Sequence, residues 1–388
     1  MKTRFPTVPL GELLSAVSRP ENPVPGKVIR QAGIRLWGKG AYERAVIDGG
    51  ATKYPVLYRL DEKDIVINKI WARNGAAAVI PKSLAGTYVS GEFPTFRCTE
   101  TRMLTPWMEA FTKHPWFWSQ CTEQSRGTSG KNRIRPENFL RVLVPLPGLD
   151  EQLRLASLLN AVSFRIGEAY SLQTALAIAH EDLCFSVVSE IAVGAPRLPL
   201  KEVAPIIRRK VAVDLNSEYP ELGIRSFGKG TFHKPAITGA KLGSKRIYRI
   251  EPGDLLFSNV FAWEGAIAIS QPEDKDRFGS HRFITCLPDP SKVLAEYLRT
   301  WFLSAEGMAE IRAASPGAAG RNKTLSLKKL QAIQIPIPDM AKQRRFAEVY
   351  SRVQAARKLN AQTAAELEAI MPAALSQVFQ GAISGKMA

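Results

Sequence analysis

The sequence predicts a mixed α/β protein of the α+β kind, made of two repeated domains separated by two long helices that form an antiparallel coiled coil. Three observations carry this prediction. The 388 residues are too many for one ordinary core, so two domains of roughly 150 residues are expected. The two halves of the chain match when one is shifted by 190 positions, and each half ends in a stretch with heptad spacing.

The repeat is clearest in a glycine-rich block, where residues 33–40 (GIRLWGKG) align with residues 223–230 (GIRSFGKG). The same offset pairs Asp64 with Asp254, Gly75 with Gly265, Ala76 with Ala266, Ser90 with Ser280 and Ser125 with Ser315. Each half is therefore expected to hold one compact domain, a proline-containing exit and a helix. The predicted domains are residues 1–146 and 193–337, and the predicted helices are residues 147–192 and, with the C-terminal tail, 338–388.

Inside the domains, short apolar runs between turns predict strands, as at residues 64–67 (DIVI) and 254–257 (DLLF). We interpret Asp64 and Asp254 as the first residues of hairpin strands and not as metal ligands, because neither has a second carboxylate and a lysine in the required arrangement. The aromatic stretches at residues 107–118 and 297–302 predict one amphipathic helix per domain, with the tryptophans in the core.

Two heptad seams of about 30 to 40 residues predict the long helices. The first seam comprises Leu159, Val162, Ile166, Ala169, Gln173, Leu176, His180, Leu183 and Val187, and the second Phe346, Val349, Val353, Ala356, Asn360, Thr363, Leu367 and Ile370. Polar residues inside such seams lower stability but fix the register. His180 is therefore interpreted as a seam residue and not as a ligand or base.

The net charge of +17 and the pI near 9.8 predict a polyanionic partner, either nucleic acid or an anionic membrane surface. No apolar run approaches the ~20 residues of a membrane-spanning helix, which argues against a membrane. The two predicted domains carry net charges of +10 and +8, whereas residues 150–192 carry −4 and residues 339–388 carry +3. An acidic helix pairing with a basic one is therefore expected.

Four widely spaced cysteines without a CxxC pair indicate neither a disulfide framework nor a zinc site, and favour a reducing, cytoplasmic setting. The glycine-rich blocks come close to a phosphate-binding loop, but Gly40 and Gly230 stand where Ser or Thr would hold Mg²⁺. The four histidines form no HExxH pattern, and no pair of acids has the spacing of a nuclease or glycosidase. The sequence thus predicts no catalytic residue, no metal site and no cofactor.

The basic, glycine-rich blocks are interpreted as loops that face DNA. Their cations would contact phosphates or guanine edges, and their glycines would either let amides approach phosphates or simply form turns, two alternatives that the sequence leaves open. The candidate residues of the first block are Arg35, Gly38, Lys39 and Gly40, with Arg225, Gly228, Lys229 and Gly230 in its copy. A second glycine-rich block adds Lys131, Arg133, Arg321 and Lys323.

The junctions between domains and helices carry a family resemblance. Residues 145–152 (PLPGLDEQ) and 336–343 (PIPDMAKQ) are similar to the Pro-Leu-Pro-Pro-Leu-x-Glu-Gln motif that begins the spacer helices in specificity subunits of type I restriction–modification systems, although Lys342 stands where Glu is usual. Residues 227–232 (FGKGTF) and the tail at residues 377–386 also resemble that family. The likeness extends over nearly the whole chain.

This resemblance implies that each domain is a target recognition domain for one half of a bipartite site in double-stranded DNA. The helices would set the gap and dock two methyltransferase (modification) subunits, which bind S-adenosylmethionine, while restriction/translocase subunits cleave. The chain itself would be non-catalytic. The alternatives are a coiled-coil interaction or scaffold protein whose basic charge is incidental, and a DNA-modifying enzyme, for which the expected motifs are missing.

Overall fold

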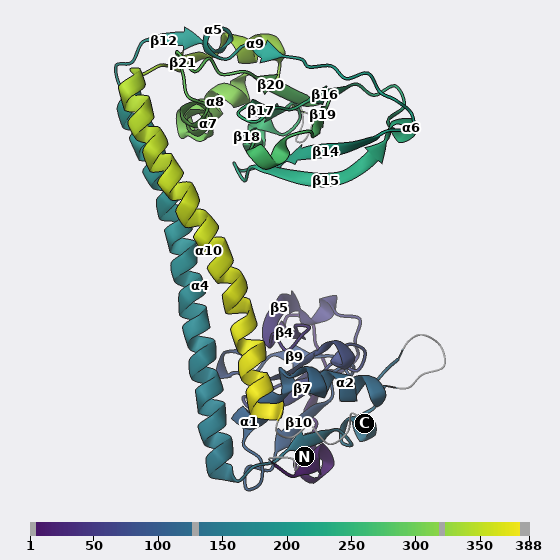
Figure 1. Ribbon diagram of the computed structural model, residues 1–388. Helices are drawn as coiled ribbons and strands as arrows, with labels where there is room; N and C mark the ends of the chain where they lie inside the picture. The colour runs from purple at the N-terminus through teal and green to yellow at the C-terminus, as the bar shows by residue number, and fades with distance from the viewer. Residues whose placement is uncertain (1–4, 126–131, 318–322, 381–388) are drawn as a thin grey trace. The chain divides into compact units, whose positions relative to one another are not determined.

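The computed structural model describes residues 5–125, 132–317 and 323–380 (Figure 1). The chain divides into two compact units: unit 1 comprises Met1–Ser171 and Gln362–Ala388, and unit 2 comprises Leu172–Ala361. Each unit contains a globular α/β part and one portion of each of two long helices, so the mixed α/β class is confirmed. Within the described residues, no helix is both long and apolar enough to cross a membrane.

The described residues of the globular part of unit 1 form three small sheets, in which all strand pairs are antiparallel except β4 with β9. The two-stranded sheet is β1 (Thr7–Pro9) with β11 (Leu143–Pro145). The four-stranded sheet has the order β2 (Leu14–Val17), β10 (Thr95–Cys98), β7 (Ile65–Ile67), β8 (Ala77–Val79). The five-stranded sheet has the order β3 (Pro20–Glu21), β6 (Leu57–Arg59), β9 (Tyr88–Val89), β4 (Val28–Ile34), β5 (Ala41–Asp48). The helices are α1 (Thr105–Thr112), α2 (Pro115–Glu123) and α3 (Pro136–Phe139).

Unit 2 repeats this topology, as the matching halves of the sequence predict, except that its third sheet has no strand equivalent to β3 among the described residues. Its sheets are β12 (Arg197–Pro199) with β21 (Gln334–Pro336); β13 (Ile206–Ile207), β20 (Phe283–Cys286), β17 (Leu255–Ser258), β18 (Ile267–Ile269); and β15 (Thr231–Thr238), β14 (Glu218–Ile224), β19 (Phe278–Ser280), β16 (Ile247–Arg249). Its helices are α5 (Leu200–Val203), α6 (Gly239–Leu242), α7 (Ala295–Leu303), α8 (Ala305–Ala313) and α9 (Leu327–Ala332). The parallel pair β14 with β19 corresponds to β4 with β9.

The prediction of one amphipathic helix over residues 107–118 is wrong, whereas residues 297–302 lie within the single helix α7 as predicted. Pro115 occupies the first position of α2, where its missing N–H costs nothing, and it separates α2 from α1. In unit 2 the chain likewise forms α7 and then α8, with Ser304 capping the start of the second helix. The core position of Trp107 is confirmed, because its side chain is fully buried and its indole N–H donates to the Pro145 carbonyl at 2.8 Å.

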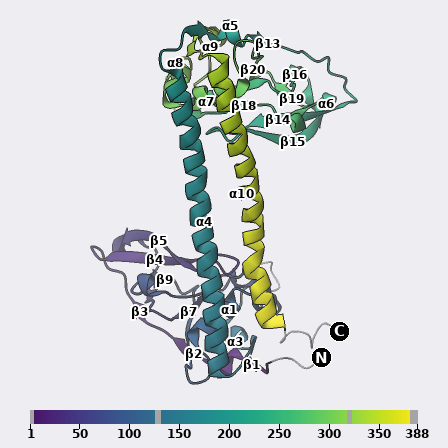
Figure 2. The same ribbon diagram turned by 60° about the vertical axis from the view of Figure 1, so that its left-hand side comes forward.

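The two long helices are α4 (Leu149–Ala192) and α10 (Met340–Gln380). Within each unit their segments lie side by side and run in opposite directions (Figures 1 and 2). In unit 2 the Gln173 amide donates to the Asn360 carbonyl at 3.5 Å, which joins two residues of the predicted seams. The antiparallel pairing is therefore confirmed.

Near the end of α4 the predicted seam is wrong at Leu176 and Leu183, whereas Val187 packs against the core of unit 2 as predicted. Leu176 and Leu183 are 43% and 46% exposed, whereas Cys184 and Val188 are buried in the core of unit 2 with Phe346. An α-helix has 3.6 residues per turn, so a strict heptad drifts by about 20° per repeat. The buried face therefore moves by one position along the helix.

A buried glutamine joins each long helix to a globular part, and we call this contact the glutamine junction. In unit 1 the Gln152 side chain accepts from the Leu104 N–H at 2.9 Å and donates to the carbonyls of Arg102 and Pro147 at 3.0 and 2.9 Å. In unit 2 the equivalent side chain makes the same three contacts: Gln343 accepts from Leu294 at 2.9 Å and donates to Lys292 at 3.2 Å and Pro338 at 2.8 Å. Both glutamines are fully buried.

Replacing Gln152 by Ala is expected to lower the free energy of unfolding of unit 1 by about 2–4 kcal/mol, because three buried backbone groups lose their partner. Urea denaturation of the full chain, followed by circular dichroism, measures this loss. The matched control is Gln173→Ala in the same helix, which removes a single long hydrogen bond and should cost less than about 1 kcal/mol. Equal stability of the two variants would contradict the role of the glutamine junction.

His114 introduces a pH dependence into unit 1. Its Nδ1 accepts from the Trp116 N–H at 3.1 Å at the start of α2, and its ring packs on that of Phe379 in α10 at a centroid distance of 5.2 Å. Burial lowers the pKa of His114 from 6.5 to about 4, because the charged form loses its hydration.

The unfolded chain therefore takes up a proton between about pH 6.5 and pH 4 that folded unit 1 does not, so acidification through this window should destabilise unit 1 by about 3 kcal/mol. Thermal unfolding at closely spaced pH values measures the effect. His114→Asn keeps an acceptor at the helix start but does not titrate, so its stability should vary less with pH than that of the wild type. Parallel pH profiles would show that His114 is not the responsible group.

Candidate nucleic-acid interface

The first basic block forms the tip of the β4–β5 hairpin, and we call residues 35–40, with their copy at residues 225–230, the cationic tips. In unit 1 the Arg35 N–H closes the hairpin by donating to the Gly40 carbonyl at 2.9 Å. The amides of Trp37 and Gly38 donate to the carbonyls of Asn74 and Gly75 at 2.7 and 3.0 Å. The tip is therefore fastened to the 3₁₀ turn Ala72–Asn74 that precedes β8.

Unit 2 builds its cationic tip with the same bonds. Arg225 donates to Gly230 at 2.9 Å, Phe227 to Glu264 at 2.8 Å and Gly228 to Gly265 at 2.8 Å. The turn that receives the tip is the 3₁₀ segment Ala262–Glu264. Two distant stretches of sequence thus present the same rigid loop.

The glycines of the tips allow the loop backbone to adopt positive φ angles. Gly38 and Gly228 both have φ +64°, and a Cβ atom at Gly38 would lie 2.7 Å from the Cα of Lys113. Their amides bond to protein carbonyls, so for these two glycines the structure favours the turn interpretation over amide contact with phosphate. Gly40 and Gly230 also have positive φ, but a Cβ atom there would meet nothing within 4 Å.

The cations of the tips divide into two kinds. The Arg35 guanidinium lies over the Tyr42 ring at 4.6 Å, and that of Arg225 lies over the Phe232 ring at 5.0 Å, which restrains both side chains. Lys39 and Lys229 are exposed, and the ammonium group of neither has a hydrogen-bond or ion-pair partner among the residues that the structure describes. These two ammonium groups are therefore available to an external anion.

The second basic block is only partly described, because Lys131 and Arg321 lie outside the described residues. Arg133 forms an ion pair with Glu92 at 3.3 Å. Lys323 lies 4.9 Å from the ring centroid of Trp263, which belongs to the turn that holds the tip of unit 2. The structure thus brings Lys323 to a turn that carries a cationic tip, whereas Arg133 pairs with Glu92.

The tip of unit 2 borders a hollow of about 450 Å³ that the sequence analysis missed. Lys229 lines it together with Arg299 of α7 and Arg357 of α10. Arg299 also donates to the Gly228 carbonyl and lies 5.9 Å from the Tyr350 ring centroid. Three cations around one hollow suit an anion such as a phosphate group. Only the packing of α7 beside α10 brings them together, so no local sequence signal could have indicated them.

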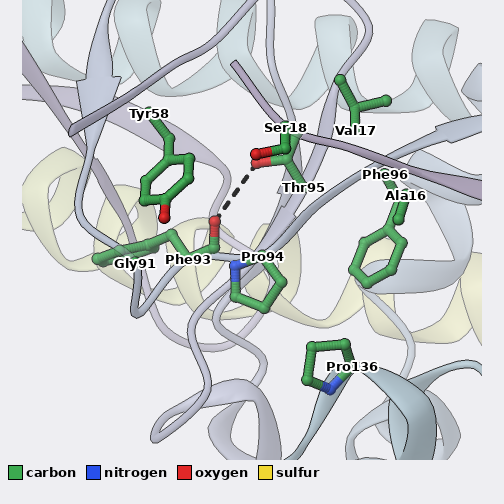
Figure 3. Close-up of a pocket in the computed structure, with 10 residues that line it drawn as sticks. All are labelled: Ala16, Val17, Ser18, Tyr58, Gly91, Phe93, Pro94, Thr95, Phe96 and Pro136. Atoms are coloured by element: carbon green, nitrogen blue, oxygen red, sulfur yellow. Dashed lines mark hydrogen bonds between the residues drawn. The ribbon is translucent and has the colours of Figure 1, made fainter. Parts of the chain in front are cut away.

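Unit 1 has a different pocket, of about 210 Å³, which is lined by residues of β2, β6 and β10. Figure 3 shows the rings of Tyr58, Pro94 and Phe96 around it, and the Thr95 hydroxyl donating to the Phe93 carbonyl at 3.3 Å. None of the 10 lining residues is charged. This pocket therefore offers apolar contacts but no general acid or base.

The buried aspartates are structural. Asp64 is fully buried and bonds to Arg19 at 2.6 Å and Arg97 at 2.9 Å, and Asp254 bonds to Arg209 at 2.6 Å. Each carboxylate also accepts a backbone N–H three residues upstream, which fixes the turn before β7 or β17. These contacts agree with the interpretation of both residues as the start of a hairpin strand.

The cysteine thiols are poor nucleophiles, because burial raises the pKa of both Cys98 and Cys286 to about 12. No group of three or more His, Cys, Asp or Glu side chains among the described residues could hold a metal ion. The features that the two units share are therefore cationic tips and structural ion pairs.

A comparison with known families finds one match, in the second half of the chain. Residues 198–369 match the family described as Type I restriction modification DNA specificity domain, which confirms the resemblance drawn from the sequence motifs. No curated protein sequence matches the chain.

Solved structures match over almost the whole length. A chain from a structural study of complex assembly and conformational transition of the type I R-M system has a TM-score of 0.66 at 20% identity, with 97% of each chain covered. The HsdS subunit from Thermoanaerobacter tengcongensis has a TM-score of 0.54 at 20% identity, covering 98% of this chain and 97% of that one. At these identities the likeness shows a shared fold.

Proposed function

We propose, on the premise that residues 198–369 belong to the type I restriction modification DNA specificity domain family, that the chain recognises a bipartite sequence in double-stranded DNA. It directs methyltransferase (modification) subunits and restriction/translocase subunits to that sequence. The observation that carries the proposal is the duplication of the cationic tip, with the same backbone bonds and the same cation–ring contacts in two domains. Two equivalent cationic tips on one chain suit a DNA target with two half-sites.

In this proposal residues 1–146 and 193–337 are the target recognition domains, and residues 147–192 and 338–388 supply the spacer helices and the tail. The domains carry net charges of +10 and +8, which favour the DNA backbone. Lys39 and Lys229 contact phosphates, because they are exposed and unpaired among the described residues. Arg35 and Arg225 read guanine edges, since a guanidinium already restrained by a ring loses little freedom on binding.

The spacer helices dock the methyltransferase subunits. Phe164 and Leu172 of α4 are 65% and 71% exposed, so the helix keeps apolar surface outside its seam that a partner helix can cover. The partner subunits bind S-adenosylmethionine and methylate the DNA, so this chain contributes sequence recognition and no catalytic residue. Its free cysteines suit the reducing cytoplasm in which such a complex works.

The division of labour between the tips is testable with two double variants. Arg35→Ala with Lys39→Ala should weaken recognition of one half-site, and Arg225→Ala with Lys229→Ala should weaken recognition of the other. Each lost base contact should cost about 1–3 kcal/mol, and each lost phosphate contact should reduce the salt dependence of binding by about one counterion. Affinities of the complex for duplexes varied one half-site at a time, at several salt concentrations, measure both effects.

Arg165→Ala is the matched control, because this arginine is exposed on α4 and pairs with Glu168 at 2.9 Å. It removes a cation outside the tips and should leave both half-sites unchanged. If both double variants relaxed the same half-site, the assignment of one tip to each half would be wrong.

The role of the helices as spacers predicts a change in the gap between the half-sites. Seven residues inserted after Gln173 and seven after Asn360, its contact partner, keep the seam in register. Each helix lengthens by about 10 Å, and at about 3.4 Å per base pair the gap should grow by roughly one to three base pairs. Methylome sequencing of a strain that expresses the complex reads the gap and both half-sites together.

Insertion into α4 alone is the control, since it shifts the two seams against each other and should abolish methylation. An unchanged gap with altered half-sites would contradict the spacer role.

A further inference from the structure

A comparison of the two repeats isolates one unusual backbone position. Among the described residues, six pairs of positions 190 apart have positive φ in both copies: 37 and 227, 38 and 228, 40 and 230, 63 and 253, 75 and 265, and 86 and 276. Five of these pairs have glycine in at least one copy. The remaining pair is Trp37 and Phe227, both with φ +60°. An aromatic side chain is disfavoured in this conformation, so its presence in both copies needs a reason.

Burial does not supply that reason. Trp37 is 50% exposed and Phe227 is 70% exposed, so neither ring gains much by leaving water. The Trp37 ring has one edge contact, with Trp118 at a centroid distance of 5.5 Å, and Phe227 has no ring contact among the described residues. The amides that donate to Asn74 and Glu264 hold the backbone conformation, and glycine would make these bonds equally well.

The surroundings of the two rings point to their ligand. Trp37 lies between Arg35 and Lys39 in the sequence of the tip, and Phe227 lies between Arg225 and Lys229. The turn that holds each tip begins with a second exposed aromatic residue, Trp71 in unit 1 and Phe261 in unit 2. Apolar rings bracketed by cations match a DNA groove, where base edges and base faces lie between two rows of phosphates.

We infer that Trp37 and Phe227 make apolar contacts with the bases of the DNA target, one ring in each half-site. The inference rests on the proposed function and adds two specificity-determining residues to it. The restrained tip holds each ring outward before DNA arrives, so little conformational freedom is lost on binding.

The test uses glycine substitutions, because glycine is the residue best suited to φ +60°. The full chain with its methyltransferase subunits first selects duplexes from a random-sequence pool, and affinities are then measured for a selected duplex and a scrambled one. Phe227→Gly and Trp37→Gly should bind the selected duplex about tenfold or more weakly, while affinity for the scrambled duplex changes little. The thermal unfolding midpoint of Phe227→Gly should not fall below that of the wild type.

Two controls separate the ring from the backbone. Phe227→Trp and Trp37→Phe exchange the residues of the two copies and should keep tight binding. Lys63→Gly relieves the same backbone conformation at a position where the other copy already has Gly253, and it should leave DNA affinity unchanged.

Wild-type affinity of both glycine variants for the selected duplex would overturn the inference. It would also be overturned if the variants lost the methyltransferase subunits while the chain still bound DNA, because the rings would then contact a protein. A fall in the unfolding midpoint of Phe227→Gly would show a structural role instead. If the wild-type complex selects no sequence at all, the proposed function fails and the inference fails with it; if it selects and the variants match it, only the inference fails.

Discussion

The glutamine junction is the contact on which the placement of each globular part depends. A carboxamide is the one neutral side chain that can accept one hydrogen bond and donate two from a single planar group, and Gln152 and Gln343 use all three against backbone atoms. A glutamate at the same place would put a carboxylate against two carbonyl oxygens. The first turn of each long helix is thereby fixed to the start of α1 or α7, and this contact acts together with the packing of the helix in the core of its unit to set the direction in which the helix leaves the globular part.

A second set of buried contacts links this framework to the cationic tips. Asp64 and Asp254 bring an arginine from the start of the domain to the strand that leads into the receiving turn, and that turn supplies the carbonyls that hold the tip. Breaking a buried ion pair by removing one partner is costly, because the other charge stays without compensation. Recognition loops of the proposed kind need this rigidity, since a base contact contributes to specificity only if the side chain is held in place before DNA binds.

Much of the fold could be predicted from the sequence, because the repeat and the heptads are local patterns. The aromatic spacing of residues 107–118 predicts one helix and does not reveal that Pro115 begins a second one. The heptad pattern places Leu176 and Leu183 in the seam because an ideal heptad ignores the drift of a real helix. The candidate cations of the first block lie together on the tips as expected, although their contact with DNA stays a prediction, while Lys131 and Arg321 lie outside the described residues. Arg299 and Arg357 depend on tertiary packing, and the importance of Trp37 and Phe227 depends on a dihedral angle that no residue pattern shows.

The partners of the glutamine junction have an evolutionary consequence. Gln152 and Gln343 bond only to main-chain atoms, which every residue type provides, so substitutions among the side chains of a globular part leave the junction chemically unchanged. Because the two junctions are alike, a globular part from one half of the chain, or from a homologue, meets the same requirements at either helix. Gene recombination at the junctions can therefore exchange a whole globular part without any compensating mutation in the helices, and under the proposed function such an exchange would replace one half-site in a single step.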